Sequence, residues 1–351
     1  MKKSSFRLID LWRSDENYSN YRIPGMIVTK RQTLIVYCEA RRTSSDWSMM
    51  DIIMQRSTNN GETFAPPIVL AHGTKQHPTV NNPVMVEDQN GRIHFLYCED
   101  YTINGGRVLR RYSDDDGISW SEPIDISEFA MPKFHNAFAL GPGHGVKTPK
   151  GTLIIPIWMV PKHYNAPLNS HSPSVISTFY SKDNGQTWAI GDILTTTADV
   201  INPNETAAAI TSDGKVYLNI RTVGYHRAKA YSENGYSDFY NYATDYKLPD
   251  PHCFGSLAVY DHEDDPYSLI FVNCNHQTSR KNVCVRASLD DGKNFAVCRV
   301  IDESRGGYCE VAANNALGLI FVLYEDKFGI SDHLAVFDFE WIRQNENIDT
   351  N

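Results

Sequence analysis

The sequence predicts an all-β fold: a six-bladed β-propeller with four-stranded antiparallel blades, formed as a single domain by residues 1–351. Three observations predict it: a turn motif that recurs along the chain, a spacing of the copies close to one sixth of the chain length, and a near absence of helical patterns. The chain shows no linker rich in Pro, Gly or Ser and no shift in composition, so we expect one domain.

The recurring motif reads Ser, then Asp or Asn two residues later, then x-Gly, then Trp or Phe three residues on. Complete copies occupy residues 57–64, 113–120, 181–188 and 288–295, and a degenerate copy with a displaced glycine occupies 232–239. The Asp or Asn side chain can bond backbone amides further along a tight turn, and the Gly supplies positive φ without steric cost. The motif therefore predicts tight turns, each covered by its aromatic residue.

Strand patterns precede most copies, such as residues 51–56 (DIIMQR) and 282–287 (NVCVRA), and a strand before a tight turn predicts a hairpin. The copies begin 56, 68, 51 and 56 residues apart, and one sixth of the chain is about 58 residues. Units of this size fit four-stranded blades arranged radially. We expect residues 337–344 to form one last strand with a polar end.

The net charge of −9 and the pI near 5.7 argue against a nucleic-acid or anionic-membrane partner. An anionic ligand would therefore need a local cluster of arginines. No apolar run reaches the ~18 residues that a membrane helix needs, and the N-terminus has no apolar core of a signal peptide. We expect a protein that is either cytoplasmic or secreted with its signal removed.

Seven cysteines are scattered along the chain without a CxxC pair, so we expect buried thiols rather than a disulfide framework or a zinc site. Twelve histidines are equally dispersed, and none forms an HExxH pattern. We therefore expect neither a catalytic metal nor a cofactor.

Further motifs follow one another along nearly the whole chain. They are Tyr21-Arg22-Ile23-Pro24, Glu39-Ala40-Arg41, Asp46-Trp47, residues 141–145 (GPGHG) and 151–156 (GTLIIP), Asn204-Glu205-Thr206, residues 218–221 (LNIR), Arg280, Gly307-Tyr308 and Leu323-Tyr324-Glu325. In this order, together with the turn motif known as the Asp box, they resemble the sialidase (neuraminidase) family, namely bacterial-type exo-α-sialidases. The resemblance implies a glycoside hydrolase that removes terminal sialic acid from glycoconjugates with retention, through a tyrosyl-enzyme intermediate.

Sialic acid bears a carboxylate on its anomeric carbon, and arginine pairs with a carboxylate in a planar, bidentate geometry that lysine cannot match. The resemblance assigns this binding role to Arg22, Arg221 and Arg280. Arg286 is a nearby competitor for the third position, although it lies within a predicted strand and closer to the last Asp box.

The resemblance assigns the nucleophile to Tyr308 and the base beside it to Glu205. Retaining glycosidases generally use a carboxylate nucleophile, and sialidases are an exception. An attacking Asp or Glu would be repelled by the substrate carboxylate, whereas a phenol is neutral near pH 7. A phenol with a pKa of about 10 is a weak nucleophile and needs a base to take its proton.

Asp46 is the candidate general acid, and Asp51 is the alternative, although its place at a strand start suggests a structural role. We expect Arg41 to support the carboxylate site or to steer Asp46, and Glu325 to hold Arg22 through a buried ion pair. Asn82 occupies a place where many bacterial members carry Asp, near the pocket for the N-acyl or glycerol group. The sugar pocket could be lined by Trp47 or Trp158.

Three other functions are open at this point. A transferring or intramolecular sialidase would pass the sugar to an acceptor hydroxyl instead of water, and the sequence does not separate the two. A non-catalytic lectin would keep the arginines but lose the nucleophile or the acid, whereas Tyr308 and Asp46 are both present. An Asp-box glycosidase for neutral sugars would lack the arginine cluster.

Overall fold

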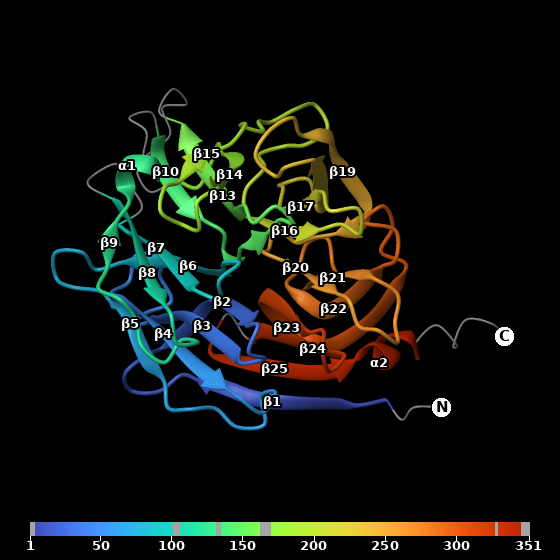
Figure 1. Ribbon diagram of the computed structural model, residues 1–351, viewed down its shortest axis with the longest axis horizontal. Helices are drawn as coiled ribbons and strands as arrows, with labels where there is room; N and C mark the ends of the chain where they lie inside the picture. Colours follow the sequence, from blue (N-terminus) through green and yellow to red (C-terminus); the bar gives the residue numbers. More distant parts are fainter. Residues whose placement is uncertain (1–3, 101–105, 131–134, 162–169, 327–328, 345–351) are drawn as a thin grey trace.

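A computed structural model describes residues 4–100, 106–130, 135–161, 170–326 and 329–344. Six blades, each a four-stranded antiparallel sheet, form a ring around a central axis (Figure 1). This architecture confirms the predicted six-bladed β-propeller. Within each blade, one strand lines the axis and the other three follow it outward.

Strands that are consecutive or nearly so in the sequence form the first four blades. The first blade comprises β2 (Asn20–Val28), β3 (Leu34–Arg41), β4 (Met50–Ser57) and β5 (Ile68–His72), and the second β6 (Val80–Glu87), β7 (Ile93–Glu99), β8 (Arg107–Ser113) and β9 (Ile124–Asp125). The third comprises β10 (His135–Leu140), β13 (Leu153–Pro161), β14 (Val175–Ser181) and β15 (Ala189–Ile190), and the fourth β16 (Thr206–Ile210), β17 (Val216–Ile220), β18 (His226–Ser232) and β19 (Tyr240–Pro249). Two short strands, β11 (Gly143–His144) and β12 (Val146–Lys147), pair with β6 and β13 respectively.

The last two blades share one long strand, β23 (Val297–Asn314). Its first part pairs with β22 and its second part with β24, so the strand ends the fifth blade and begins the sixth. The fifth blade also contains β20 (Ser256–Tyr260), β21 (Ser268–Cys274) and β22 (Lys281–Ser288), and the sixth also contains β24 (Leu319–Asp326), β25 (Ser331–Asp338) and β1 (Phe6–Arg13).

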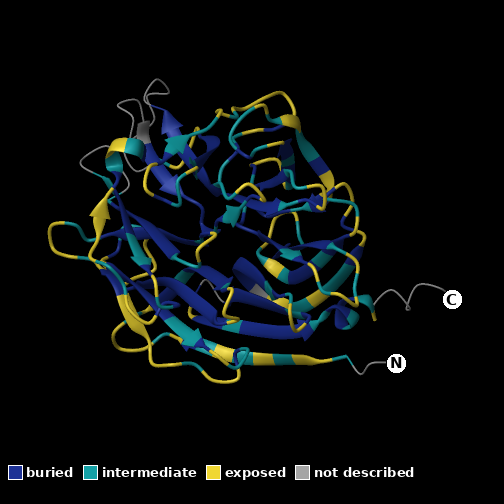
Figure 2. Ribbon diagram, in the orientation of Figure 1, coloured by how far each residue is buried: buried dark blue, intermediate teal, exposed yellow. Residues whose placement is uncertain are grey.

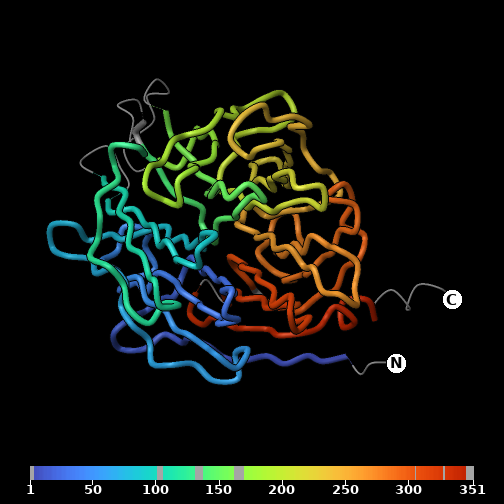
Figure 3. The backbone as a smooth tube through the Cα atoms, in the orientation of Figure 1, coloured from blue at the N-terminus to red at the C-terminus, as the bar shows by residue number. Residues whose placement is uncertain are grey.

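The N-terminal strand closes the ring. β1 is the outermost strand of the sixth blade and pairs with β25 in antiparallel register, from Phe6 opposite Phe337 to Arg13 opposite Ser331. Figure 3 shows this N-terminal segment, in blue, lying beside the C-terminal strands in red. Pairing the two ends of the chain in one blade fastens the ring, and β1 covers the edge that β25 would otherwise leave free.

The core lies between the faces of neighbouring blades. Successive residues of a strand point to opposite faces, so β3 serves two clusters: Ile35 and Tyr37 pack toward the second blade, whereas Leu34 and Val36 pack toward the sixth. Blade strands covered on both faces are therefore buried along their length, as β13 is. Figure 2 shows the buried inner strands and the exposed residues of the outer strands and loops.

The repeated motif forms turns between the third and fourth strands of five blades. In the first copy, the amide of Gly61 donates to Ser57 Oγ at 2.8 Å, and the amide of Thr63 donates to Asn59 Oδ1 at 3.0 Å. Gly61 has a φ of 76°, where a side chain would be strained. The glycine amide bonds the serine in the same way in the other complete copies, at Gly117, Gly185 and Gly292.

The C-terminal segment differs from the expectation of a single last strand over residues 337–344. β25 ends at Asp338, and residues Phe339–Arg343 form a short helix, α2. The Asp338 carboxylate accepts a hydrogen bond of 2.9 Å from the Trp341 amide and so caps this helix. The aromatic residues that suggested a strand are buried because one face of the helix packs on the apolar cluster of the fifth and sixth blades. Among the described residues, the other helix is α1 (Ser127–Ala130).

Candidate active site

Blade topology brings distant residues to one end of the ring. In an antiparallel blade, the innermost strand begins where the second strand ends. In the first blade, Arg22 lies near the start of β2, and Arg41 is the last residue of β3. In the fourth blade, Glu205 directly precedes β16, and Arg221 directly follows β17. These four side chains therefore reach the same mouth of the propeller.

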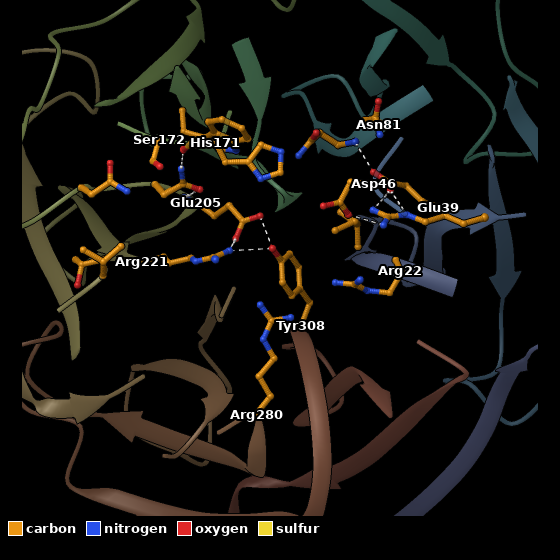
Figure 4. Close-up of a pocket in the computed structure, with 18 residues that line it drawn as sticks. Arg22, Glu39, Asp46, Asn81, His171, Ser172, Glu205, Arg221, Arg280 and Tyr308 are labelled. Carbon is orange, nitrogen blue, oxygen red and sulfur yellow. Dashed lines mark hydrogen bonds and ion pairs between the residues drawn. The ribbon is translucent and has the colours of Figure 1, made fainter. Parts of the chain in front are cut away.

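A cavity of about 350 Å³ opens at this mouth, near the small end of the ~300–1,000 Å³ typical of ligand pockets. Figure 4 shows polar and charged side chains converging on it from several blades. Its lining residues are Arg22, Ile23, Glu39, Arg41, Asp46, Asn81, Asn82, Trp158, His171, Ser172, Asn202, Asn204, Glu205, Arg221, Thr222, Val223, Arg280 and Tyr308. The structure thus brings together eight of the ten predicted site residues; Glu325 lies behind the wall, and Trp47 lies outside the lining.

Tyr308 lies at the centre of this set, bonded to two groups of the fourth blade (Figure 4). Its hydroxyl donates to Glu205 Oε1 at 2.7 Å and accepts from Arg221 Nη1 at 2.9 Å. Arg221 also forms an ion pair with Glu205 Oε2. The phenol oxygen therefore contacts both a carboxylate that can take its proton and a cation that can stabilise a phenolate.

Burial raises the pKa of Tyr308 well above its usual value, and the negative charge of Glu205 raises it further. The positive charges of Arg221 and Arg280 act in the opposite direction but do not compensate. The phenol is therefore neutral at physiological pH, and a phenolate could form only if a base such as Glu205 took its proton.

Glu325 lies behind the cavity wall and forms hydrogen bonds with three residues of the site. Its fully buried carboxylate accepts hydrogen bonds from Arg22 Nε at 2.8 Å, the Ile23 amide at 2.9 Å and the Tyr308 amide at 3.0 Å. The predicted pair of Glu325 with Arg22 is present, and the contact with Tyr308 was not foreseen. Ile23 has a φ of 58°, which is strained for a β-branched residue, and its bond to Glu325 offsets part of that cost.

Arg280 lies across the ring of Tyr308 from Arg22, and each guanidinium carbon is 5.4 Å from the ring centroid. One nitrogen of Arg280 donates to the carbonyl of His252 at 3.2 Å. Within the described ranges, no carboxylate lies at ion-pair distance from Arg280. Its competitor Arg286 lies opposite Cys298 in the β22–β23 pair and is absent from the cavity lining.

Arg41 is buried between two carboxylates. It forms an ion pair with Glu39 Oε2 at 2.5 Å and another with Asp46 Oδ1 at 2.6 Å, while Asp46 stays nearly half exposed. Burial favours the neutral acid, but Arg41 outweighs it and lowers the pKa of Asp46, with a smaller contribution from Arg22. Arg41 therefore contacts Asp46 directly, which is the arrangement that one of its two expected roles requires.

Asp51, the alternative acid, lies in β4 and outside the cavity lining. Its carboxylate accepts a hydrogen bond of 2.6 Å from the hydroxyl of Tyr18, consistent with a structural role. Trp47 packs against the large apolar cluster of the second to fourth blades, with its ring 6.4 Å from that of His171. Trp158, the other tryptophan considered, is the one that lines the cavity.

Asn82 lines the cavity in a left-handed backbone conformation, with φ at 53°. Its backbone N–H donates a hydrogen bond of 2.8 Å to Glu39 Oε1. The neighbouring Asn81 also lines the cavity, and its Oδ1 is buried without a hydrogen-bond partner in the described part of the chain. Asn81, His171 and Ser172 were missed by sequence reasoning. The pair Asn81-Asn82 at the start of a strand was a usable signal, whereas nothing near His171 stood out.

No group of three or more His, Cys, Asp or Glu side chains suited to a metal ion occurs within the described residues. In the same part of the chain, no helix is both long and apolar enough to cross a membrane.

Comparisons with known proteins identify the family to which the chain belongs. Residues 32–322 match the family model described as BNR repeat-like domain. The exo-alpha-sialidase of Arthroderma benhamiae is 28% identical over 382 aligned residues, covering 96% of this chain and 88% of the fungal protein. The chain belongs to the sialidase family. It is an enzyme of the glycoside hydrolase class.

Solved structures share the fold of this sialidase-family chain. The Hadza microbial sialidase Hz136 superposes with a TM-score of 0.79 at 23% identity, over 91% of this chain and 66% of its own. The intramolecular trans-sialidase from Ruminococcus gnavus superposes with a TM-score of 0.78 at 15% identity, over 93% of this chain and 96% of its own. At these identities the likeness establishes the propeller fold alone.

Proposed function

We propose that this enzyme is a retaining exo-α-sialidase that hydrolyses terminal sialic acid from glycoconjugates through a covalent intermediate on Tyr308. One observation carries the proposal: Tyr308 shares a single cavity with Glu205, Asp46 and an arginine cluster. The names of the relatives support sialylated glycans as the substrates. We also infer that residues 1–351 act as one domain, because β1 closes the ring by pairing with β25.

Three arginines account for recognition of an acidic sugar. Arg22, Arg221 and Arg280 come from the first, fourth and fifth blades and surround the phenol of Tyr308. Arg22 and Arg221 are held by Glu325 and Glu205, whereas Arg280 contacts only a carbonyl among the hydrogen-bond partners described. We infer that Arg280 donates a large share of the hydrogen bonds to the substrate carboxylate. The cavity, about 350 Å³ in volume, is near the small end of the range for ligand pockets, which fits an enzyme that removes terminal residues.

The first step forms the intermediate. The Tyr308 oxygen attacks the anomeric carbon while its proton moves to Glu205, and Asp46 gives a proton to the departing glycosidic oxygen. A neutral phenol avoids repulsion from the substrate carboxylate, which for two unit charges ~4 Å apart amounts to ~4 kcal/mol at an effective dielectric constant of 20. In the second step, water attacks the same carbon, Asp46 takes its proton, and the proton on Glu205 returns to Tyr308.

Asp46 must be protonated to act as the acid, although Arg41 and Arg22 lower its pKa in the free enzyme. A bound carboxylate would neutralise much of the field of Arg22 and add its own negative charge. Both effects raise the pKa of Asp46. Substrate binding therefore promotes protonation of the acid that the reaction needs.

Proton NMR of the first product tests the proposal. Incubation with an α-sialoside is expected to release free sialic acid first as the α anomer, because two displacements restore the starting configuration. Initial release of the β anomer would contradict retention. An anhydro sugar or a new glycosidic linkage would identify an intramolecular or intermolecular transferase, and binding without turnover would identify a lectin.

A further inference from the structure

Two cysteine sulfurs lie in contact on the fifth blade, away from the cavity. The Sγ atoms of Cys284 in β22 and Cys298 in β23 are 2.8 Å apart. Cys298 is opposite Arg286, and Cys284 is opposite Val300, so the cysteines are diagonal neighbours on one face of the sheet. A disulfide has its sulfurs about 2.05 Å apart, so a shift of less than 1 Å would join them.

The two thiols differ in access to solvent. All seven cysteines lie in the described part of the chain, and six of them are buried. Cys298 is partly exposed because it lies on the outermost strand of its blade, whereas Cys284 lies one strand further in. A reagent from solution would therefore reach Cys298 first and Cys284 only through Cys298.

The surroundings favour a thiolate on Cys298. The hydrogen bond with Cys284 lowers the pKa of Cys298 to about 7, against the opposing effect of burial, and the guanidinium of Arg286 lowers it further. The same contact, together with burial, raises the pKa of Cys284 well above its usual value. A partly exposed thiolate beside a buried thiol has the asymmetry of an attacking and a resolving cysteine.

We propose that Cys298 is a site of covalent thiol modification, which reacts with low-molecular-weight disulfides and passes the bond to Cys284. The thiolate of Cys298 attacks one sulfur of the reagent, breaks its S–S bond and expels one reagent thiolate. Cys284 then loses its proton, attacks the Cys298 sulfur and expels the second thiolate. Two protein thiols are oxidised to a disulfide, the reagent is reduced to two thiols, and both protons end on them.

The disulfide would join neighbouring strands around the last Asp-box turn. It would close a short loop over residues 284–298, and such a link restricts the unfolded chain. β22 begins directly after Arg280, and β23 continues to Tyr308, so the link would secure the pairing of two strands that lead to the cavity. The inference rests on the cysteine geometry and does not depend on the proposed reaction.

The test is to incubate the full-length protein with oxidised glutathione under native conditions. After removal of the reagent, the wild type is expected to weigh two hydrogen atoms less than the reduced chain. Tryptic digestion without reduction should yield residues 282–286 linked to residues 294–299. The unfolding midpoint should rise by a few degrees and return when the protein is reduced.

Three variants separate the attacking role of Cys298 from the resolving role of Cys284. Cys284→Ser is expected to stop at a glutathione adduct on Cys298, and Cys298→Ser to react at least roughly tenfold more slowly with no link. Cys38→Ser, which removes a buried thiol of another blade, should behave as the wild type. A glutathione adduct that persists on the wild type, links between other cysteines, or equal rates for wild type and Cys298→Ser would overturn the proposal.

Discussion

Glu205 Oε1 accepts a hydrogen bond of 2.7 Å from the hydroxyl of Tyr308, although 103 residues separate the two in the sequence. They meet because Glu205 precedes the inner strand of the fourth blade and Tyr308 lies in the strand shared by the last two blades. Arg221 contacts both groups from the other side. In the mechanism proposed above, this contact is the path of the phenol proton.

Replacing Glu205 by Gln is expected to lower kcat by roughly 10²- to 10⁴-fold, because an amide can accept the hydrogen bond but cannot take the proton. Turnover of a fluorogenic sialoside measures the effect. Glu99→Gln is the matched control, since Glu99 also pairs with an arginine, Arg107, but lies outside the cavity. If Glu205→Gln kept more than half of the wild-type kcat, Glu205 would not be the base.

The pH profile should report Asp46. Arg41 lowers the pKa of Asp46, so the free enzyme holds less of the acid form as the pH rises above the ordinary value of that carboxyl. For an alkyl sialoside, whose leaving oxygen needs a proton, kcat/KM should therefore fall with rising pH by up to about tenfold per unit. An aryl sialoside with an acidic phenol should show a shallower fall.

Asp46→Asn should abolish this difference in slope, because the variant has no acid to titrate. It should lower kcat/KM by roughly 10²- to 10⁴-fold for the alkyl sialoside and much less for the aryl sialoside. Equal losses on both substrates would exclude Asp46 as the proton donor. For Asp51→Asn, kcat/KM should depend on pH as it does in the wild type for both sialosides, because Asp51 lies outside the cavity lining.

Arg280→Lys is expected to raise KM by roughly 10- to 100-fold, the equivalent of the ~1.5–3 kcal/mol of a hydrogen bond between charged groups. Lysine keeps the positive charge but loses the planar fork. Arg286→Lys is the matched control from β22, the strand that follows Arg280, and it should leave KM within twofold of the wild type. A larger effect from Arg286 than from Arg280 would reverse the assignment.

The prediction for Glu325 concerns stability. Glu325→Gln removes the charge that compensates the mostly buried Arg22, so we expect a loss of about 3 kcal/mol in the free energy of unfolding. Denaturation in urea measures it. Glu62→Gln breaks the exposed pair with Arg7 and should cost less than about 0.5 kcal/mol. Similar values for the two variants would contradict the proposed role of Glu325.

The propeller could be predicted from the sequence because its turns are local. Each turn is set by a few neighbouring residues, such as Ser57, Asn59 and Gly61, and recurs often enough to fix the size of a blade. The C-terminal helix could not be predicted, because Phe339, Trp341 and Ile342 suit a strand as well as a helix. Its formation depends on the cap by Asp338 and on packing against the fifth and sixth blades.

The candidate site was predicted from motifs, and the structure adds what motifs cannot show. Nothing in the sequence indicates that the Glu325 carboxylate would bond the Tyr308 amide, because this contact depends on the pairing of β23 with β24. The entry of His171 into the cavity, and of Trp158 rather than Trp47, depends on how the third blade packs, not on a local pattern.

Covalent trapping tests the central claim most directly. A sialosyl fluoride with a second fluorine beside the anomeric carbon should form the intermediate and release it slowly. Digestion with trypsin and fragmentation by mass spectrometry should place one adduct on Tyr308, within residues 306–327, and Tyr308→Phe should take no label and turn over roughly 10²-fold more slowly. A label on Glu205 or Asp46 of the wild type, or steady turnover by Tyr308→Phe, would contradict the tyrosyl-enzyme.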